Sequence, residues 1–111
     1  MEKVIKNGQV GVLISPGYGA GWSTWNHDVD MKVMMMDARI IKAWQAGRLT
    51  EETAFDTLKE LGIIDDDDYI YGGGVPSLTL HWVPVGQEFR VVENDGFEYV
   101  QEKEEIDWLT A

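Results

Sequence analysis

The sequence predicts an α+β domain in which a helical hairpin packs on an antiparallel β-sheet, and three observations lead to this prediction. Asn7-Gly8 and Asp95-Gly96 are strong signals for tight turns between paired strands. Apolar residues at helical spacing predict two helices, at about 37–46 and 51–61, each followed by a glycine. The 111 residues suit a single domain that spans residues 1–111.

The strands are expected at both ends of the chain. Residues 4–14 predict two short strands around Asn7-Gly8, and the second of them is nearly all apolar, as a central buried strand should be. Two further strands are predicted at residues 78–82 and 89–93. A last strand at 97–101 is expected to pair with the strand at 89–93 through the turn at Asp95-Gly96. This order predicts one antiparallel sheet that ends in a meander.

The two helices have recognisable starts. Asp37 and Thr50 are residue types that cap helix N-termini, and Glu51 and Glu52 follow Thr50 where the helix dipole favours acids. Residues 28–36 are ambiguous, because they suit either a short strand or a lead into the first helix.

Composition excludes several classes of function. The net charge of -11 argues against general binding of DNA or RNA, which needs clustered Lys and Arg. The absence of cysteine excludes disulfides and thiolate metal sites. No signal peptide or membrane-length apolar run is visible, so a cytoplasmic protein without a cofactor is expected.

The most unusual segment is the Gly- and Trp-rich loop 15–26, Ser-Pro-Gly-Tyr-Gly-Ala-Gly-Trp-Ser-Thr-Trp-Asn. It matches neither a P-loop nor a dinucleotide fingerprint. Its glycine amides suit an anion and its rings suit stacking on a base, but the same features suit a tightly folded connection anchored by tryptophan. As a ligand pocket it would use Tyr18, Gly19, Gly21, Trp22, Trp25 and Asn26, with charge from Arg39 or Arg90.

Other polar groups give weaker signals. His27-Asp28 and His81 are interpreted as surface residues rather than as an acid–base or zinc site. The run Asp65–Asp68 lacks the ligand spacing of an EF-hand and is interpreted as a solvated turn. Neither a metal site nor a catalytic site is predicted.

Residues 12–26, together with Tyr71-Gly-Gly-Gly74, Leu78–Pro84, Phe89-Arg90 and Asn94–Glu98, resemble a group of small bacteriophage and prophage proteins. The chain is also similar in character to phage anti-defence proteins that act as oligomeric sponges for nucleotide second messengers of bacterial immunity. That resemblance implies a homo-oligomer that sequesters a small nucleotide-like ligand without cleaving it. The net charge and the lack of a membrane-length apolar run predict that it binds neither nucleic acid polymers nor membranes.

Two other functions stay open at this point. An acidic chain can act as a protein-binding inhibitor of a host enzyme. A small phosphodiesterase-like enzyme would use His27, Asp28 or His81. The leading hypothesis is the non-enzymatic sponge.

Overall fold

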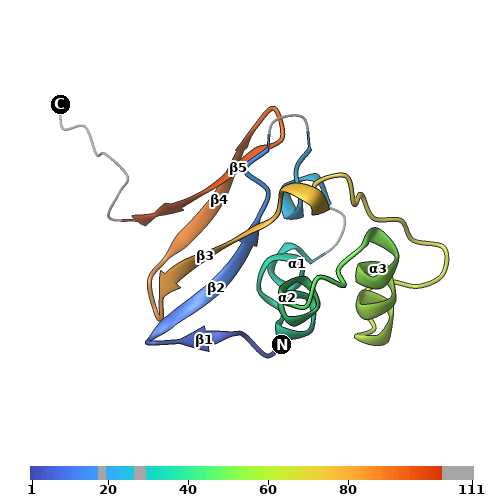
Figure 1. Cartoon of the computed structure of the whole chain (residues 1–111), viewed down its shortest axis with the longest axis horizontal. Helices are drawn as coiled ribbons and strands as arrows, with labels where there is room; N and C mark the ends of the chain where they lie inside the picture. The colour runs from blue at the N-terminus through green and yellow to red at the C-terminus, as the bar shows by residue number, and fades with distance from the viewer. Residues whose placement is uncertain (18–19, 27–29, 104–111) are drawn as a thin grey trace.

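The computed structural model describes residues 1–17, 20–26 and 30–103. Its five strands are β1 (Ile5–Lys6), β2 (Gln9–Ile14), β3 (Thr79–Pro84), β4 (Phe89–Asn94) and β5 (Phe97–Glu102). Its α-helices are α1 (Met31–Met36), α2 (Ala38–Gln45) and α3 (Glu51–Glu60), and short 3₁₀ turns cover Ser23–Trp25 and Val75–Ser77. Figure 1 shows the helices gathered on one side of the strands. The predicted α+β class is confirmed.

Both predicted hairpin turns form. Asn7 and Gly8 take φ of 53° and 74°, and Asp95 and Gly96 take 51° and 84°. Positive φ at both central residues defines the turn type that matches the twist of paired strands, which is why Asn-Gly and Asp-Gly mark these positions.

The strands form two sheets, so the prediction of a single sheet is wrong. β2 lies between β1 and β3 in one antiparallel sheet, and β4 pairs only with β5 in a second. β2 pairs with β3 along its whole length, from Gln9↔Pro84 to Ile14↔Thr79. The chain then turns at Val85–Glu88, and the apolar residues Phe89, Val91 and Val100 of the β4–β5 hairpin pack against the core instead of extending the first sheet.

The helical hairpin is confirmed as α2 and α3. Asp37 caps α2 by accepting from the N–H of Arg39 at 2.8 Å, and Thr50 caps α3 in a reciprocal capping box with Thr53. In the ambiguous segment 28–36, the part from Met31 to Met36 forms α1, and Asp30 caps it by accepting from the N–H of Lys32 at 3.0 Å. None of the helices in the described part of the chain is long and apolar enough to cross a membrane.

Buried side chains form two clusters. The larger one joins β2, α2 and α3 around Trp22, and the smaller one lies between β2, β3 and the β4–β5 hairpin. The helix α1 contributes to both, since Val33 and Met34 belong to the first cluster while Met35 and Met36 belong to the second. α1 therefore connects the helical hairpin to the strand hairpin.

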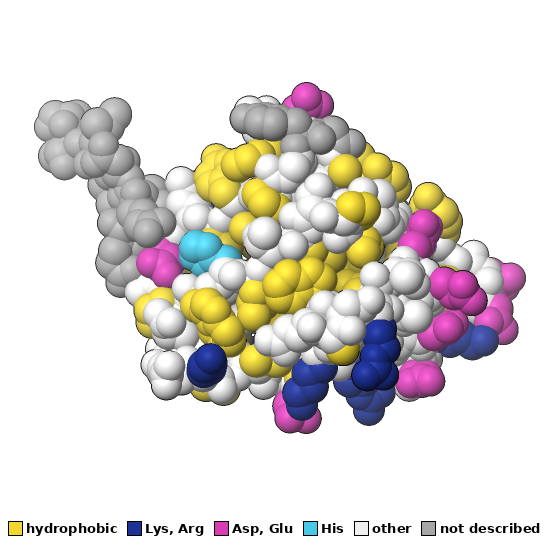
Figure 2. All heavy atoms as spheres, viewed as in Figure 1, with side chains coloured by type: hydrophobic (Ala, Val, Ile, Leu, Met, Phe, Trp, Pro, Cys, Tyr) yellow, Lys and Arg dark blue, Asp and Glu magenta, His cyan; other side chains and the backbone are white. Residues whose placement is uncertain are grey.

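Acidic side chains gather near α3, at the right of Figure 2. Asp65–Asp68 are all exposed, and Asp66 pairs with Lys59 of α3. The interpretation of this run as a solvated turn agrees with its exposure.

Candidate functional site

The loop 15–26 does bind an anion, and that anion is the protein's own Glu98. One carboxylate oxygen accepts from the N–H of Ser15 at 2.8 Å. The other accepts from the N–H groups of Trp22 and Thr24, at 2.8 and 3.0 Å, and from the Thr24 hydroxyl at 2.5 Å. Glu98 is fully buried, so these four hydrogen bonds replace its contacts with water.

Backbone pairing supports the same contact. The N–H of Glu98 donates to the Ser15 carbonyl at 2.8 Å, just beyond the end of β2. The Ser15 hydroxyl donates to the Ala20 carbonyl at 2.6 Å and closes the loop on itself. The loop therefore binds a carboxylate of its own chain, and the amides that do so are those of Ser15, Trp22 and Thr24 rather than the glycine amides that the sequence predicted for an external anion.

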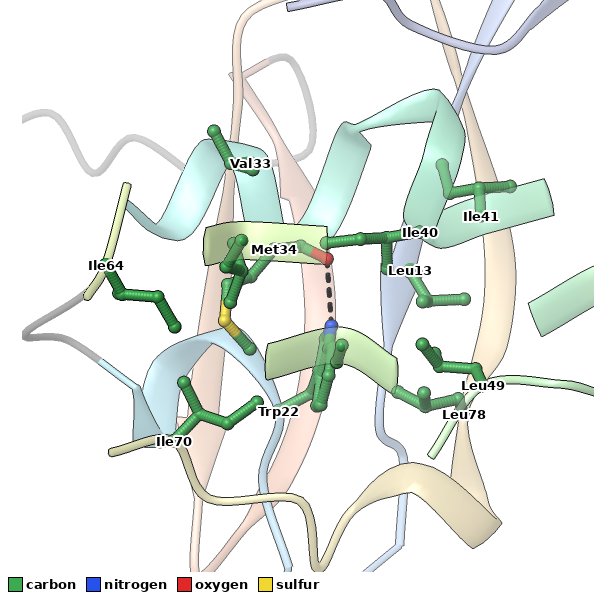
Figure 3. Packing of buried hydrophobic residues seen from close by; sticks show 12 residues of the cluster. Leu13, Trp22, Val33, Met34, Ile40, Ile41, Leu49, Ile64, Ile70 and Leu78 are labelled. Atoms are coloured by element: carbon green, nitrogen blue, oxygen red, sulfur yellow. Dashed lines mark hydrogen bonds between the residues drawn. The ribbon is translucent and has the colours of Figure 1, made fainter. Parts of the chain in front are cut away.

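Trp22 is a core residue, and its predicted role as a stacking platform needs correction. Its side chain has 0% exposure and lies among Leu13, Met34 and Ile70 (Figure 3), so no ring face is open to a ligand. The indole N–H donates to the Met34 carbonyl at 2.9 Å. Met34 lies in the last turn of α1, where backbone carbonyls lack hydrogen-bond donors within the helix, and the Trp22 indole supplies a donor.

Asn26 links the loop to the segment before β3. Its amide donates to the carbonyls of Trp22 and Tyr71, at 2.8 and 2.9 Å, and accepts from the N–H of Tyr71 at 2.6 Å. Asn26 is only 5% exposed, and its amide is engaged by the chain's own backbone. These contacts favour a structural role for Asn26.

Trp25 is half-buried and lies beside Tyr71, with ring centroids 5.0 Å apart. Its indole N–H donates to Glu93 at 3.2 Å. Gly21 leaves room for this ring, because a Cβ there would lie 2.4 Å from Trp25 Cδ1. Trp25 is the one tryptophan of the loop that keeps partial exposure.

The structure does not bring the remaining predicted residues into one pocket. Tyr18 and Gly19 lie outside the described residues, as do His27 and Asp28. Arg39 is exposed in the first turn of α2, and Arg90 is exposed on β4. The Nε of Arg90 donates to Gln101 Oε1 at 2.7 Å across the hairpin, on the face opposite Phe89 and Val91, as the alternation of the strand predicts.

His81 is exposed on β3, in agreement with its interpretation as a surface residue. In the ranges 1–17, 20–26 and 30–103, no group of three or more His, Asp or Glu side chains is placed to hold a metal ion.

The described surface has a different concave site, a groove of about 530 Å³ between α1 and β4. Its apolar lining comes from Met31, Met35 and Met36 of α1 and from Phe89 and Val91 of β4. Asp30, Lys32 and Arg90 supply its charged groups. We call this site the Met groove.

One acid with a shifted pKa, Glu88, lies near an end of the Met groove. Glu88, next to Phe89, has its pKa lowered by the hydrogen bond from Lys103 and by the charge of that ammonium group. The two side chains are 2.8 Å apart and exposed, so this pair fixes the end of the hairpin only weakly.

Glu98 and the Met groove were both missed by the sequence predictions. A signal for Glu98 exists in the alternation of β5, which places residue 98 on the same face as Val100. The Met run 34–36 and the alternation of Phe89 and Val91 predict burial, but they do not predict a groove between α1 and β4.

Comparisons with known proteins add no relative: no protein-family model, no curated protein and no solved structure matches the chain.

Proposed function

We propose that this protein is a non-enzymatic binding protein that sequesters a small ligand in the Met groove. The ligand would have a flat apolar part and an anionic group, which is the chemistry of a nucleotide-like signal. The observation that carries the proposal is the groove itself, with its apolar lining from α1 and β4 and with Lys32 at its border.

The size and lining of the groove suit a small molecule. Ligand sites generally enclose about 300–1,000 Å³ and are mostly apolar, and the Met groove has a volume of about 530 Å³. Phe89 offers a ring, and methionine side chains adapt to ligands because they are unbranched and polarisable. A planar ring placed between them would be desolvated on both faces.

The charges at the groove differ from those of the whole chain. Its lining includes Asp30, Lys32 and Arg90, but the Arg90 guanidinium lies against Gln101 on the opposite face of β4, so the charges facing the groove are those of Asp30 and Lys32, whereas the protein carries a net charge of -11. For Arg90 to reach a ligand, its guanidinium must leave Gln101. An exposed hydrogen bond of this kind contributes about 0.5–1.5 kcal/mol, which a charge-assisted bond to a phosphate can replace.

In the phage setting implied by the sequence resemblance, such a protein would hold an immune second messenger intact and withhold it from its receptor. We include in the proposal that the active form is a homo-oligomer. Slow release of the ligand, rather than turnover, would then determine its effect.

A second candidate function is capture of an apolar segment of a host protein. The three methionines favour it, because methionine-rich surfaces adapt to different apolar side chains. This is the protein-binding inhibitor that the acidic composition also allows.

The test is isothermal titration of the purified protein with a panel of mono-, cyclic and oligonucleotides, alongside native mass spectrometry of the freshly purified protein. Phe89→Ala should weaken nucleotide binding about 5- to 150-fold, since stacking on one ring contributes about 1–3 kcal/mol. Tyr99→Ala is the matched control, because Tyr99 lies on the opposite face of the same hairpin.

Lys32→Gln should also weaken binding, and the effect should shrink at high salt. Lys42→Gln removes an exposed lysine of α2 that does not line the groove, and should leave binding unchanged. Equal affinity in the wild type and Phe89→Ala would overturn the groove assignment. Recovery of a chemically altered nucleotide would overturn the non-enzymatic proposal, and capture of a host protein without any nucleotide would favour the second candidate.

A further inference from the structure

A second hollow, of about 400 Å³, lies between the first turn of α3 and the segment 68–70, and it shares no lining residue with the Met groove. It is lined by two aromatic rings, one aliphatic side chain and three carboxylates, which belong to Phe55, Tyr69, Ile70, Glu51, Glu52 and Asp68. We propose that this site, which we call the aromatic hollow, binds an arginine side chain of a partner protein. The inference is independent of the ligand proposed for the Met groove.

Tyr69 is the feature of the hollow that packing within the chain does not explain. Its side chain is 74% exposed, more than any other large apolar residue in the described ranges. The neighbouring Ile70 is only 1% exposed and packs in the cluster around Trp22, so the backbone that carries Tyr69 is anchored. Aromatic residues are enriched where one protein contacts another. The fold therefore holds at its surface a ring that its own core does not use.

The walls of the hollow are fixed by contacts on both sides of the segment that follows it. A Cβ at Gly72 would overlap Cβ and Cγ of Glu51, so a glycine there allows the chain after segment 68–70 to lie directly against the start of α3. The Asn26 amide holds the N–H and the carbonyl of Tyr71, at 2.6 and 2.9 Å. A site whose walls are already fixed loses little conformational entropy on binding.

The charges at the hollow suit a cation. In the described part of the chain, the side chains of Glu51 and Glu52 have no hydrogen-bonding or ionic partner, and Asp68 accepts only from the N–H of Asp65, at 2.8 Å. The dipole of α3 favours acids in its first turn, but it does not account for the rings beside them. A cation is attracted by the carboxylates and also by the faces of the rings, which carry the negative part of the aromatic quadrupole.

The lining favours arginine over other cations. Phe55 and Ile70 offer an apolar surface to the methylene groups of the side chain. The planar guanidinium group can lie on the Tyr69 ring and also form two parallel hydrogen bonds to one carboxylate, which a lysine ammonium group cannot do.

The same charges favour an arginine within a protein over the free amino acid. Free arginine would bring its own carboxylate close to the three at the hollow, whereas in a protein that group is an amide. The net charge of -11 also attracts a basic protein surface over a longer range. The occupant is therefore assigned as an arginine side chain on a basic surface of a partner protein.

The test is an NMR titration of the full chain with the blocked tripeptide acetyl-Gly-Arg-Gly-amide. The ring signals of Tyr69 and Phe55 and the amide signal of Ile70 should shift and saturate, because these residues line the hollow. The matched probe contains citrulline, which keeps the shape of the arginine side chain without its charge, and should not bind. A lysine tripeptide should bind more weakly, and high salt should weaken the binding of the arginine peptide.

Two variants with matched controls test the residues. Tyr69→Ala should weaken binding of the arginine peptide about 2- to 30-fold, which is the range for a cation–π contact between exposed and desolvated sites. Tyr99→Ala removes another exposed tyrosine, on β5, and should leave binding unchanged. Glu52→Gln should weaken binding more than Glu60→Gln, which removes the same charge from an exposed position of the same helix outside the hollow.

Four results would overturn the inference. The first is a citrulline peptide that binds as tightly as the arginine peptide, and the second is an unchanged affinity in Tyr69→Ala. The third is an equal loss in Glu52→Gln and Glu60→Gln, which would reduce the effect to net charge. The fourth is tighter binding of free arginine than of the peptide, which would contradict a protein partner. Phe89→Ala should leave peptide binding unchanged, so the peptide titration and the nucleotide titration can fail separately.

Discussion

The backbone N–H of Trp22 donates to the carboxylate of Glu98 at 2.8 Å, although 76 residues separate them in the chain. The same tryptophan anchors α1 through its indole N–H and the Met34 carbonyl. One residue thus connects the strand hairpin, the loop 15–26 and the first helix. The loop has the amides of an anion site, and the fold uses them to bind β5.

Glu98→Gln should destabilise the protein by about 2–4 kcal/mol. The glutamine amide would place N–H groups where one carboxylate oxygen now accepts from backbone donors, and hydrogen bonds to a charged group contribute about 1.5–3 kcal/mol each. Urea unfolding measures the loss. Glu60→Gln, at an exposed position of α3, should change stability by less than about 0.5 kcal/mol. Equal midpoints for the two variants would show that the buried contacts carry little energy.

Trp22→Ala should cost about 3–5 kcal/mol, as removal of large buried rings does. Trp22→Phe keeps most of the apolar volume but leaves the Met34 carbonyl without its donor, at a cost of about 1–3 kcal/mol. Thermal unfolding followed by circular dichroism ranks the two variants. A Trp22→Ala protein as stable as the wild type would restore the ligand-binding role predicted from the sequence.

Ser23→Ala should leave stability unchanged or raise it. The Ser23 hydroxyl is fully buried and has no hydrogen-bond partner among residues 1–17, 20–26 and 30–103, so the substitution removes an uncompensated polar group. Ser15→Ala is the matched control, because the Ser15 hydroxyl donates to the Ala20 carbonyl at 2.6 Å. The control should lose about 1 kcal/mol. A larger loss for Ser23→Ala than for Ser15→Ala in chemical unfolding contradicts this assignment.

Gly74→Ala should destabilise the contact between the loop and the segment before β3. A Cβ at residue 74 would lie 2.4 Å from the Gly21 carbonyl oxygen, and backbone on both sides resists the shift. Overpacking of this kind costs about 1–3 kcal/mol. At the neighbouring Gly73 the atoms nearest to the added Cβ belong to the Tyr71 side chain, which can shift more easily than backbone, so Gly73→Ala should cost less. The order of the two unfolding midpoints checks the prediction.

Local signals in the sequence were sufficient for most of the fold. The turns at Asn7-Gly8 and Asp95-Gly96 and the caps at Asp37 and Thr50 depend on residues within a few positions of each other, and all four form as predicted. The split into two sheets arises because β4 pairs with β5 and not with the edge of β3, while Phe89 and Val91 pack against core residues that are distant in the sequence. Local patterns carry no information about it.

The loop 15–26 shows even more clearly that local sequence patterns do not predict contacts between distant residues. Its glycines and tryptophans were correctly identified as unusual, but their use depends on Glu98, which lies 74–83 residues from its donors. In β5 the aromatic residues Phe97 and Tyr99 alternate with Glu98, which makes the glutamate look like the outward-facing residue. The buried face is set instead by the pairing of Val100 with Val91. The homo-oligomer, the ligand and the single-domain assignment stay predictions.

Lys103→Gln should raise the pKa of Glu88 back toward its ordinary value. The Lys103 ammonium group lowers that pKa first by its hydrogen bond and then by its charge. Because the folded pKa lies below the unfolded one, the stabilisation by this pair is present above about pH 4.5 and is lost as the pH falls through the folded pKa. Carboxyl NMR titration of the wild type and the variant measures the change, and high salt should reduce it because both groups are exposed. An unchanged Glu88 titration in Lys103→Gln would show that the ion pair between Lys103 and Glu88 does not form in solution.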